Sequence, residues 1–388
     1  MIYTVNVIGY GSGGEGVARL DDGRAVFIRN AARGDLLEIK LTQEQPRSAR
    51  ADIVRILAPS PHRMEPGCPA YRQCGGCDFR HITYDEELDA KLKRVNDAME
   101  RIGGLRARAC NILRTGQTGG YRNKAVFHFD GASLGFYRPQ SREVIPIGRC
   151  PLLKDELNEA LRDIISSKSH ESSQTLKLPS PISPFSADRL SQQPRDITLR
   201  SGRNGLDPPL EEELDGLVFK ISGFFQVNTG AALLLYQKAR EYAAMSKDES
   251  LADLYCGVGT LTLFIGRDAG YALGVELNSG AVGAARENAL RNNLSHIEFI
   301  TADATKWDAD SLKPDCVVVD PPRKGLSPGT IRKIIELSPT RIVYVSCDPA
   351  TLARDLRLLS NYAVKDICAV DMFPRTANVE CCCLLERL

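Results

Sequence analysis

Asp253-Leu-Tyr-Cys-Gly-Val-Gly259, in the last third of the chain, is the stretch that decides the fold. An apolar segment, residues 250–254, runs into this glycine-rich loop, and a helix-like apolar stretch, residues 261–265, follows it. Glycines at such a turn let the backbone approach a ligand at the N-terminus of the helix. A second apolar segment, residues 271–275, ends in Glu276, about 20 residues after the loop, where an acidic side chain can bind ribose hydroxyls in a doubly wound fold. The pattern predicts an α/β domain that binds a nucleoside-bearing cofactor.

The loop lacks the third glycine of the dinucleotide fingerprint, because only Gly257 and Gly259 stand in G-x-G spacing. A pyrophosphate cradle is therefore disfavoured. Downstream, Asp303 follows one predicted strand, and Asp320-Pro-Pro-Arg323 ends another. This order of strands and acids resembles the S-adenosylmethionine-dependent methyltransferase fold. A Rossmann-like domain for another ligand is the alternative.

Asp-Pro-Pro-Arg leaves two kinds of methyl acceptor open, because methyltransferases acting on the amino group of adenine use a similar turn. Residues 341–346 predict a buried strand, and Cys347 follows at its C-terminal end, where open α/β sheets place their ligand crevice. A thiolate there can add to C6 of uracil, which makes C5 nucleophilic enough to accept a methyl group. A base must then remove the C5 proton, and Glu380 is the candidate. Three basic residues are candidates to lower the pKa of the thiol: Arg323, Lys324 and Arg375.

Both residues also have a structural interpretation. Cys347 is one of twelve cysteines, and most of the others, including Cys381-Cys-Cys383, are expected to be small buried side chains. Glu380 alone could cap a surface turn. The catalytic interpretation is favoured because Glu380 ends the motif Phe373-Pro-Arg-Thr-Ala-Asn-Val-Glu380. This motif occurs in the same chain as the glycine-rich loop and the Cys347 segment.

Together these motifs resemble those of bacterial RNA uracil-5-methyltransferases, the enzymes that modify 23S ribosomal RNA or the T-loop of tRNA. The resemblance covers nearly the whole chain and is carried by five motifs: Phe224-Phe-Gln-Val-Asn228, Asp253-Leu-Tyr-Cys-Gly-Val-Gly-Thr260, Asp320-Pro-Pro-Arg323, Ser346-Cys-Asp-Pro-Ala-Thr-Leu-Ala-Arg354 and Val379-Glu380. It implies that Cys347 is the nucleophile and Glu380 the proton acceptor. It implies contacts to S-adenosylmethionine from six residues: Gln226, Tyr255, Thr260, Glu276, Asp303 and Asp320. Where the family usually has a histidine, this chain has Asn378, which affects the orientation of Glu380 although asparagine still donates a hydrogen bond.

The N-terminal residues, 1–57, consist of short alternating segments separated by Gly and Asp turns. This pattern predicts a small β-barrel. The segment resembles the TRAM domain, an OB-like RNA-binding module. A barrel used only for packing is the alternative.

Residues 101–150 carry a charge that the whole-chain total of +1 conceals. They hold nine basic and two acidic residues, a net of +7, and five aromatic rings are interleaved with them: Tyr121, Phe127, Phe129, Phe136 and Tyr137. Cations that neutralise phosphates and rings that stack on unpaired bases favour single-stranded RNA as the partner. A solvated basic face is the alternative.

Four cysteines form a separate pattern: Cys68, Cys74, Cys77 and the distant Cys150. Because the chain shows no signal peptide and no apolar run near 18 residues, metal is a better explanation than disulfides. Zinc favours ligand pairs two to four residues apart, whereas five residues separate the first two cysteines, and four thiolates also suit a cubane cluster. Uracil methyltransferases with this C-x5-C-G-G-C pattern bind a [4Fe-4S] cluster. The resemblance implies that these cysteines hold one in a structural role, with zinc as the alternative.

The length of 388 residues and the hydrophobic content of 43% suffice for two or three domains. We predict a TRAM or OB-like barrel at 1–57 and a central α+β, cluster-bearing, RNA-binding domain at 58–220. A Rossmann-like S-adenosylmethionine-dependent methyltransferase domain is predicted at 221–388. Residues 166–205, rich in Ser, Pro and Gln, predict an exposed insertion, a mobile hairpin or a partly disordered loop.

The expected protein is a cytoplasmic monomer without a membrane segment, and its expected substrate is 23S rRNA. The barrel and the cluster motif fit the 23S enzymes, since the tRNA enzymes usually lack both. A tRNA uracil-5-methyltransferase, an adenine-amino methyltransferase and a non-catalytic RNA-binding iron-sulfur protein are the alternatives.

Overall fold

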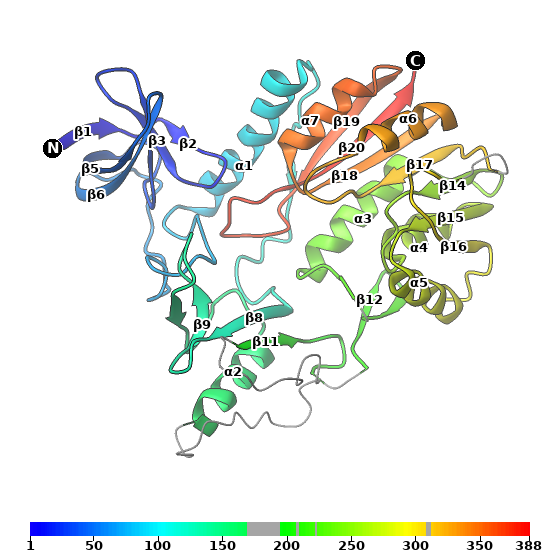
Figure 1. Ribbon diagram of the computed structural model, residues 1–388, viewed down its shortest axis with the longest axis horizontal. Helices are drawn as coiled ribbons and strands as arrows, with labels where there is room; N and C mark the ends of the chain where they lie inside the picture. The colour runs from blue at the N-terminus through cyan, green and yellow to red at the C-terminus, as the bar shows by residue number, and fades with distance from the viewer. Residues whose placement is uncertain (169–194, 207–208, 222, 308–311) are drawn as a thin grey trace.

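The computed structural model describes residues 1–168, 195–206, 209–221, 223–307 and 312–388. These residues form four β-sheets, of six, four, two and eight strands. The six-stranded and eight-stranded sheets occupy separate parts of the molecule, and helix α1 (Tyr84–Ala98) lies between them (Figure 1). The predicted succession of a β-rich N-terminal part, a central α+β part and a C-terminal α/β part is confirmed.

The N-terminal sheet has the strand order β1-β5-β6-β4-β3-β2. Its strands are β1 (Ile2–Asn6), β2 (Gly9–Tyr10), β3 (Gly16–Arg19), β4 (Ala25–Ile28), β5 (Leu36–Glu44) and β6 (Ser48–Ala58). Side chains alternate between core and solvent as the sequence pattern predicts, with Val26, Ile28, Leu37 and Ile39 fully buried. This buried stripe gives the sheet a hydrophobic core of its own.

The central part contains an antiparallel sheet with the order β10-β9-β8-β11 and helix α2 (Asp155–Lys168). Its strands are β8 (Lys124–Phe129), β9 (Leu134–Tyr137), β10 (Val144–Pro146) and β11 (Arg195–Arg200), and a hairpin of β12 (Glu211–Leu214) and β13 (Leu217–Lys220) follows. The prediction of an insertion or loop over 166–205 is wrong for β11, which pairs with β8 along its whole length because Ile197 and Leu199 alternate into the core. Residues 169–194 of that segment lie outside the described residues.

The C-terminal sheet has the order β16-β15-β14-β17-β18-β20-β19-β7. Its strands are β7 (Ile112–Leu113), β14 (Ser250–Asp253), β15 (Tyr271–Glu276), β16 (Ile297–Thr301), β17 (Cys316–Val319), β18 (Arg341–Ser346), β19 (Tyr362–Val370) and β20 (Glu380–Arg387). The five strands from β16 to β18 pair in parallel, and the order reverses between β14 and β17, which is the doubly wound arrangement. β20 enters antiparallel between β18 and β19.

Helices cover both faces of this sheet (Figure 1). One face packs on α3 (Thr229–Ala243), α4 (Thr260–Gly266) and α5 (Ser279–Arg291), and the other on α1, the π-helical turn η1 (Met99–Gly103), α6 (Pro328–Leu337) and α7 (Pro349–Leu358). Val318 joins the first core and Val317 the second, because successive strand residues point to opposite faces. Helix α1 therefore packs on the C-terminal sheet although it belongs to the central part of the sequence. None of the described helices is long and apolar enough to span a bilayer.

Candidate active site

The predicted site residues gather at the carboxyl edge of the parallel strands. Asp253, at the end of β14, pairs with Val318, and Glu276, at the end of β15, pairs with Thr301. Because parallel strands end at one edge of a sheet, the loops that follow them meet there. The remaining candidates follow the ends of β14, β16, β17 and β18: Tyr255, Thr260, Asp303, Asp320 and Cys347.

The turn from β14 to α4 is a tightly packed glycine loop. Gly257 and Gly259 have φ angles of 53° and 82°, in the left-handed region that favours glycine. A Cβ atom on Gly259 would lie 2.8 Å from Cζ of Phe299. Asp253 is buried and accepts hydrogen bonds from the Tyr255 amide at 3.2 Å and from a threonine hydroxyl of α4 at 2.6 Å. The Asp253 carboxyl, whose pKa burial raises to about 6, thus ties the loop to α4, and a residue larger than glycine would not fit at position 259.

The other residues expected to contact the cofactor near this loop differ in their hydrogen-bond partners and burial. Glu276 accepts a hydrogen bond through Oε2 from the Gly257 amide at 3.2 Å, so it touches the glycine loop directly. The hydroxyl of Tyr255 lies 2.8 Å from a threonine hydroxyl of α6. Thr260 is the first residue of α4 and is buried. Asp303 accepts two hydrogen bonds from the threonine two residues later, and these bonds lower its pKa.

Gln226 approaches the same region from the segment before α3. Its side chain hydrogen-bonds to Tyr236, a buried residue within electrostatic reach of Asp320. Asn228 caps α3 through Oδ1 and donates from Nδ2 to the carbonyl of Met372 at 3.0 Å. The motif that contains Gln226 is therefore fastened both to α3 and to the chain that leads into β20.

Cys347 and Glu380 adjoin the last residue pair of one β-ladder. β18 and β20 pair antiparallel with Ser346 opposite Cys381, so Cys347 directly follows one residue of that pair and Glu380 directly precedes the other. The charge of Glu380 acts on the Cys347 thiol. Cys347 is half-buried, and Glu380 is only 5% exposed. The interpretation of Glu380 as the cap of a surface turn is therefore wrong. The neighbouring cysteines of β20 are fully buried, as expected.

The nucleophile candidate lies among buried acids. Burial raises the pKa of Asp320 to about 7 and that of Glu380 to about 8, and the charge of Asp320 adds to the shift at Glu380. Burial and these two carboxyls raise the pKa of Cys347 to about 11. At pH 7 the Cys347 thiol and the Glu380 carboxyl are therefore mainly protonated, whereas Asp320 lies near its midpoint.

Of the three basic residues expected to lower the thiol pKa, Arg323 does so. It lowers the pKa of both Cys347 and Glu380, but burial raises both by more. Arg375 is occupied elsewhere: its amide donates to Glu87 Oε1 at 2.7 Å, and its guanidinium donates to the carbonyl of Ile82 at 3.2 Å.

Helix α1 holds the base segment, residues 371–379, a role that the sequence analysis did not assign. Lys91 is fully buried and donates to Glu87 Oε1 at 2.7 Å, to Asp371 Oδ1 at 2.6 Å and to the Phe373 carbonyl at 3.1 Å. Tyr84 donates to the other oxygen of Asp371 at 2.6 Å. The only sequence signal was the four-residue spacing of Glu87 and Lys91, which ordinarily indicates a surface pair on a helix.

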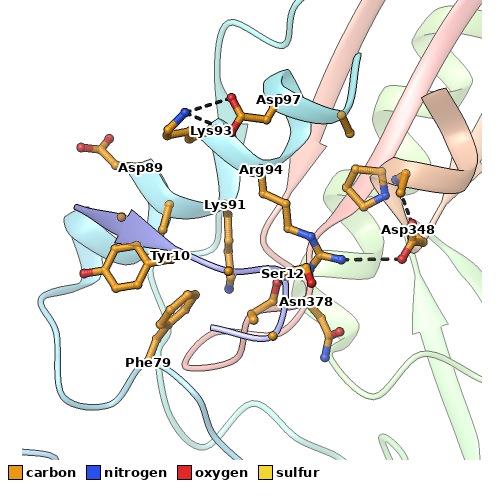
Figure 2. A pocket seen from close by; sticks show the side chains of 18 of the residues that line it. Tyr10, Ser12, Phe79, Asp89, Lys91, Lys93, Arg94, Asp97, Asp348 and Asn378 are labelled. Atoms are coloured by element: carbon orange, nitrogen blue, oxygen red, sulfur yellow. Dashed lines mark hydrogen bonds and ion pairs between the residues drawn. The ribbon is translucent and has the colours of Figure 1, made fainter. Parts of the chain in front are cut away.

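A groove with a volume of about 590 Å³ opens on Cys347 (Figure 2). It lies between residues 8–13 of the N-terminal sheet, the face of α1 that carries Lys93 and Arg94, and the start of α7. Figure 2 shows the Arg94 side chain extending from α1 toward Asp348. Asn378, at the position of the family's histidine, lines the same groove.

The four motif cysteines, Cys68, Cys74, Cys77 and Cys150, line one cavity. No described cysteine forms a disulfide. Within the described residues, no three His, Cys, Asp or Glu side chains are arranged to hold one metal ion. Three arginines also line the cavity: Arg80, Arg122 and Arg149. The Gly76 amide donates to Cys74 Sγ at 3.3 Å.

The predicted stacking rings divide into two groups. Tyr121 is 3% exposed and Phe127 is fully buried, so neither can stack on a nucleic acid base. Phe127 instead stacks on Phe136 in the central core, at a centroid distance of 4.9 Å. Tyr137 stacks on His128 at 3.7 Å and remains partly exposed. The interleaving of rings and cations along the sequence therefore has two sources. Strand alternation turns some of the rings into the core, and only the exposed rings can belong to a binding surface.

Comparisons with known proteins agree with this arrangement. Family profiles match for the tRNA (uracil-5-)-methyltransferase family at residues 304–388, the TRAM domain at 2–54 and a methyltransferase domain at 251–334. An uncharacterized RNA methyltransferase of Halalkalibacterium halodurans is 32% identical, over 96% of this chain and 94% of that protein. One of Gloeobacter violaceus is also 32% identical, over 99% and 96% respectively.

Among solved structures, that of Pyrococcus abyssi tRNA (uracil-54, C5)-methyltransferase in complex with S-adenosyl-L-homocysteine matches with a TM-score of 0.74. The sequence identity is 25%, and the match covers 98% of this chain and 99% of that one. The fold and the loop at the sheet edge thus define an S-adenosylmethionine-dependent methyltransferase. The chain belongs to the RNA uracil-5-methyltransferase family and has a TRAM domain at its N-terminus.

Proposed function

We propose that the protein methylates C5 of a uridine in RNA through a covalent bond between Cys347 and C6 of the base. The observation that carries this proposal is the end of the β18–β20 ladder, where a half-buried thiol and a buried carboxyl adjoin the last residue pair and interact electrostatically. Both groups lie at the sheet edge that holds the cofactor loop. A thiol and a carboxyl in this relation serve addition at C6 and proton removal at C5.

In the proposed reaction, the Cys347 thiolate adds to C6, and the electrons of the C5–C6 double bond move onto the C4 carbonyl as an enolate. S-adenosylmethionine supplies an electrophilic methyl group, which C5 accepts. Glu380 then removes the proton from C5, the double bond re-forms, and the thiolate leaves. The target base is expected to leave its stack first, since a ring atom inside a helix is inaccessible.

The deprotonation of Cys347 is the demanding step, because its pKa is about 11 in the free protein. Only the thiolate is the nucleophile. The cofactor carries a positive sulfonium, and a cation near Asp320, Glu380 and Cys347 favours the charged form of each. Binding of the cofactor is therefore expected to raise the thiolate fraction.

We assign the cofactor contacts to Gln226, Tyr255, Thr260, Glu276, Asp303 and Asp320. Glu276 is suited to the ribose hydroxyls, since its carboxylate follows β15 and touches the glycine loop. Asp320 offers a buried carboxyl whose pKa is raised by burial and by the charge of Asp253, and a bound cation would counter both effects. Asp303 is expected to contribute least, because it already accepts two hydrogen bonds.

We also propose that Cys68, Cys74, Cys77 and Cys150 hold a [4Fe-4S] cluster. A single zinc ion with Zn–S bonds of about 2.3 Å would bring its sulfurs to roughly 3.8 Å from one another, whereas a cubane binds each thiolate through a different iron. All four thiols line one cavity, as a shared cluster requires. Arg122, whose Nε is buried without a hydrogen-bond partner among the described residues, supplies positive charge beside it. When bound, the cluster would cross-link the loop before α1 to the central sheet.

For the RNA we propose 23S rRNA, on the basis of the N-terminal TRAM domain and the cysteine motif. The second candidate is tRNA, and a specific observation favours it: the archaeal structure that matches the whole chain is named a tRNA (uracil-54, C5)-methyltransferase. Mapping 5-methyluridine in ribosomal and transfer RNA from cells with and without the gene distinguishes them. Loss of the mark from tRNA alone would reject the first choice.

The reaction itself is tested with RNA that contains 5-fluorouridine, whose fluorine cannot be removed as a proton. Wild-type protein with S-adenosylmethionine should form an adduct that survives denaturation, and Cys347→Ala should form none. Cys256→Ala, at a buried cysteine of the glycine loop, tests whether another thiol is responsible. An adduct that persists in Cys347→Ala contradicts the proposal, and methylation of adenine would indicate the alternative class.

A further inference from the structure

One side chain of α1 links the two segments that carry the proposed catalytic groups. Arg94 donates through Nη1 to the carbonyl of Ala377 at 2.7 Å, and its Nη2 lies 3.6 Å from Asp348 Oδ2. Asp348 directly follows Cys347, and Ala377 precedes Glu380 by three residues. The Arg94 side chain is 23% exposed and lies on the wall of the groove that opens on Cys347 (Figure 2).

Both anchors of Arg94 are themselves fixed. Asp348 caps α7, with Oδ1 accepting from the amides of Ala350 at 2.8 Å and Thr351 at 3.1 Å, so that Oδ2 is left to face Arg94. The amide of Ala377 donates to Asp78 Oδ2 at 2.9 Å. Arg94 therefore joins two ordered points rather than following a mobile one.

The chemistry of the link requires a guanidinium. Its planar fork directs N–H groups to two acceptors at once, whereas a lysine ammonium is a single point charge on a flexible stem. Lys91, one turn earlier, already holds the base segment through the Phe373 carbonyl at 3.1 Å. Lys91 does not contact the nucleophile side, so Arg94 is the α1 residue that spans both segments in the hydrogen bonds and ion pairs of the described residues.

We propose that Arg94 is a positioning residue for methyl transfer, setting the distance between the Cys347 thiol and the Glu380 carboxyl; this inference rests on the proposed function. The thiol must reach C6 and the carboxyl must reach the proton on the adjacent ring carbon. A misplacement of about 1 Å between groups that act on one substrate can cost roughly 100-fold in rate. The ladder between β18 and β20 sets the backbone, and Arg94 fixes the loops beyond the end of that ladder.

The test compares five variants of the full-length protein: Arg94→Gln, Arg94→Lys, Asp348→Asn, the combined variant Arg94→Gln/Asp348→Asn and the control Arg203→Gln. Asp348→Asn keeps an N-capping side chain but removes the charge. Arg203 is an arginine in surface ion pairs with Glu211 and Glu213, both at 2.8 Å. For each variant, kcat, both KM values, the melting temperature and the rate of adduct formation with 5-fluorouridine RNA are measured.

The expected result is a loss of roughly 10- to 100-fold in kcat and in adduct rate for Arg94→Gln, with both KM values within about threefold of wild type. Arg94→Lys should recover part of the loss, and Asp348→Asn should act in the same direction, with the combined variant less than additive because the residues are in contact. Arg203→Gln should match wild type.

Three outcomes overturn the inference. Unchanged kcat in Arg94→Gln shows that no positioning is needed, whether or not the melting temperature falls. A raised KM for RNA with unchanged kcat and a weaker dependence on salt shows that Arg94 binds an RNA phosphate instead. Full activity of the combined variant shows that the contact has no role. Failure of the wild-type protein to form any adduct would reject the proposed function, which this design separates from a failure of the Arg94 inference.

Discussion

The cofactor loop and the proposed nucleophile and base share one edge of the C-terminal sheet, yet their contacts span different distances along the chain. The hydrogen bonds of the cofactor loop stay within this sheet and the helices packed on it: Asp253 bonds to residues two and nine positions away, and Gly257 bonds to Glu276, 19 positions away. The base segment depends on Lys91 and Arg94, bonded across 280 and 283 residues. The cofactor loop is thus held by elements of the C-terminal sheet itself, whereas the proposed reacting groups depend on how the central helix packs on the sheet.

The two regions are therefore expected to fail in different ways. A change in the cofactor loop should weaken cofactor binding and leave the rest of the molecule intact. A change in the contacts of α1 should alter the rate or the stability, because these contacts join distant parts of the chain. The following predictions test this distinction.

The largest effect is expected for Glu380→Gln. The amide has nearly the same shape but cannot take the C5 proton, so kcat should fall by roughly 10²- to 10⁴-fold. Addition and methyl transfer remain possible, so a covalent complex of protein and methylated RNA should accumulate even with ordinary uridine. A denaturing gel with a labelled methyl donor detects it. Turnover near the wild-type rate without the complex would exclude Glu380 as the base.

The next effect concerns stability and the long-range contacts. Lys91→Met leaves the buried carboxyls of Glu87 and Asp371 without their cation, which should cost about 3–5 kcal/mol of unfolding free energy. Denaturant unfolding measures it. Lys93→Met on the same helix is the control, since Lys93 is 61% exposed and should change stability by less than about 0.5 kcal/mol. Equal effects in the two variants would show that the buried cluster does not hold the base segment.

The same contrast explains how much could be predicted from the sequence. The sequence predicted the strand–loop–helix pattern. It also gave three candidate site residues, Glu276, Asp320 and Cys347, because period, spacing and turn chemistry are local properties. The role of α1 was not, because Lys91 and Arg94 look like ordinary charged residues of an exposed helix. Only the packing of α1 on the sheet shows that Lys91 is fully buried.

The other differences between the sequence-based predictions and the structure also depend on which side chains are buried. Tyr121 and Phe127 were predicted as stacking rings because they alternate with cations, but alternation along a strand cannot show which side faces a core. The raised pKa of Cys347 was not predicted, since it depends on burial and then on the carboxyls of Glu380 and Asp320, which come from other strands. Neither property follows from residue type and spacing alone.

A smaller effect, confined to the cofactor loop, is expected for Gly259→Ala. The positive φ of Gly259 and the 2.8 Å approach to Phe299 make a Cβ costly, at about 1–3 kcal/mol. Calorimetry with S-adenosylhomocysteine should show weaker binding, while the KM for RNA stays near wild type. Gly283→Ala in α5 is the control, because nothing lies within 4 Å of its added Cβ, and it should bind normally. Loss of RNA affinity in Gly259→Ala would contradict the expectation that a change in the cofactor loop affects cofactor binding alone.

A further effect is the dependence on pH, which links the two regions through charge. The pKa of Glu380 is raised from 4.5 to about 8, so the folded protein binds this proton more tightly than the unfolded chain. The resulting stabilisation is complete below pH 4.5 and is lost as the pH rises through about 8, whereas Glu380→Gln lacks this dependence. Wild type should therefore lose unfolding free energy relative to Glu380→Gln across that window.

Catalysis should follow the opposite course, because the base must be unprotonated. Because the pKa of Glu380 is about 8 and that of Cys347 about 11, both groups are mainly protonated at pH 7, and the rate should rise with pH through pH 8 and beyond. The sulfonium of S-adenosylmethionine should lower this pKa, and neutral S-adenosylhomocysteine should not. Difference infrared spectroscopy, with Glu380→Gln as the blank, measures the pKa of the Glu380 carboxyl with each of the two ligands. Identical pKa values with both ligands would show that cofactor charge does not reach the base, and that the two regions act independently.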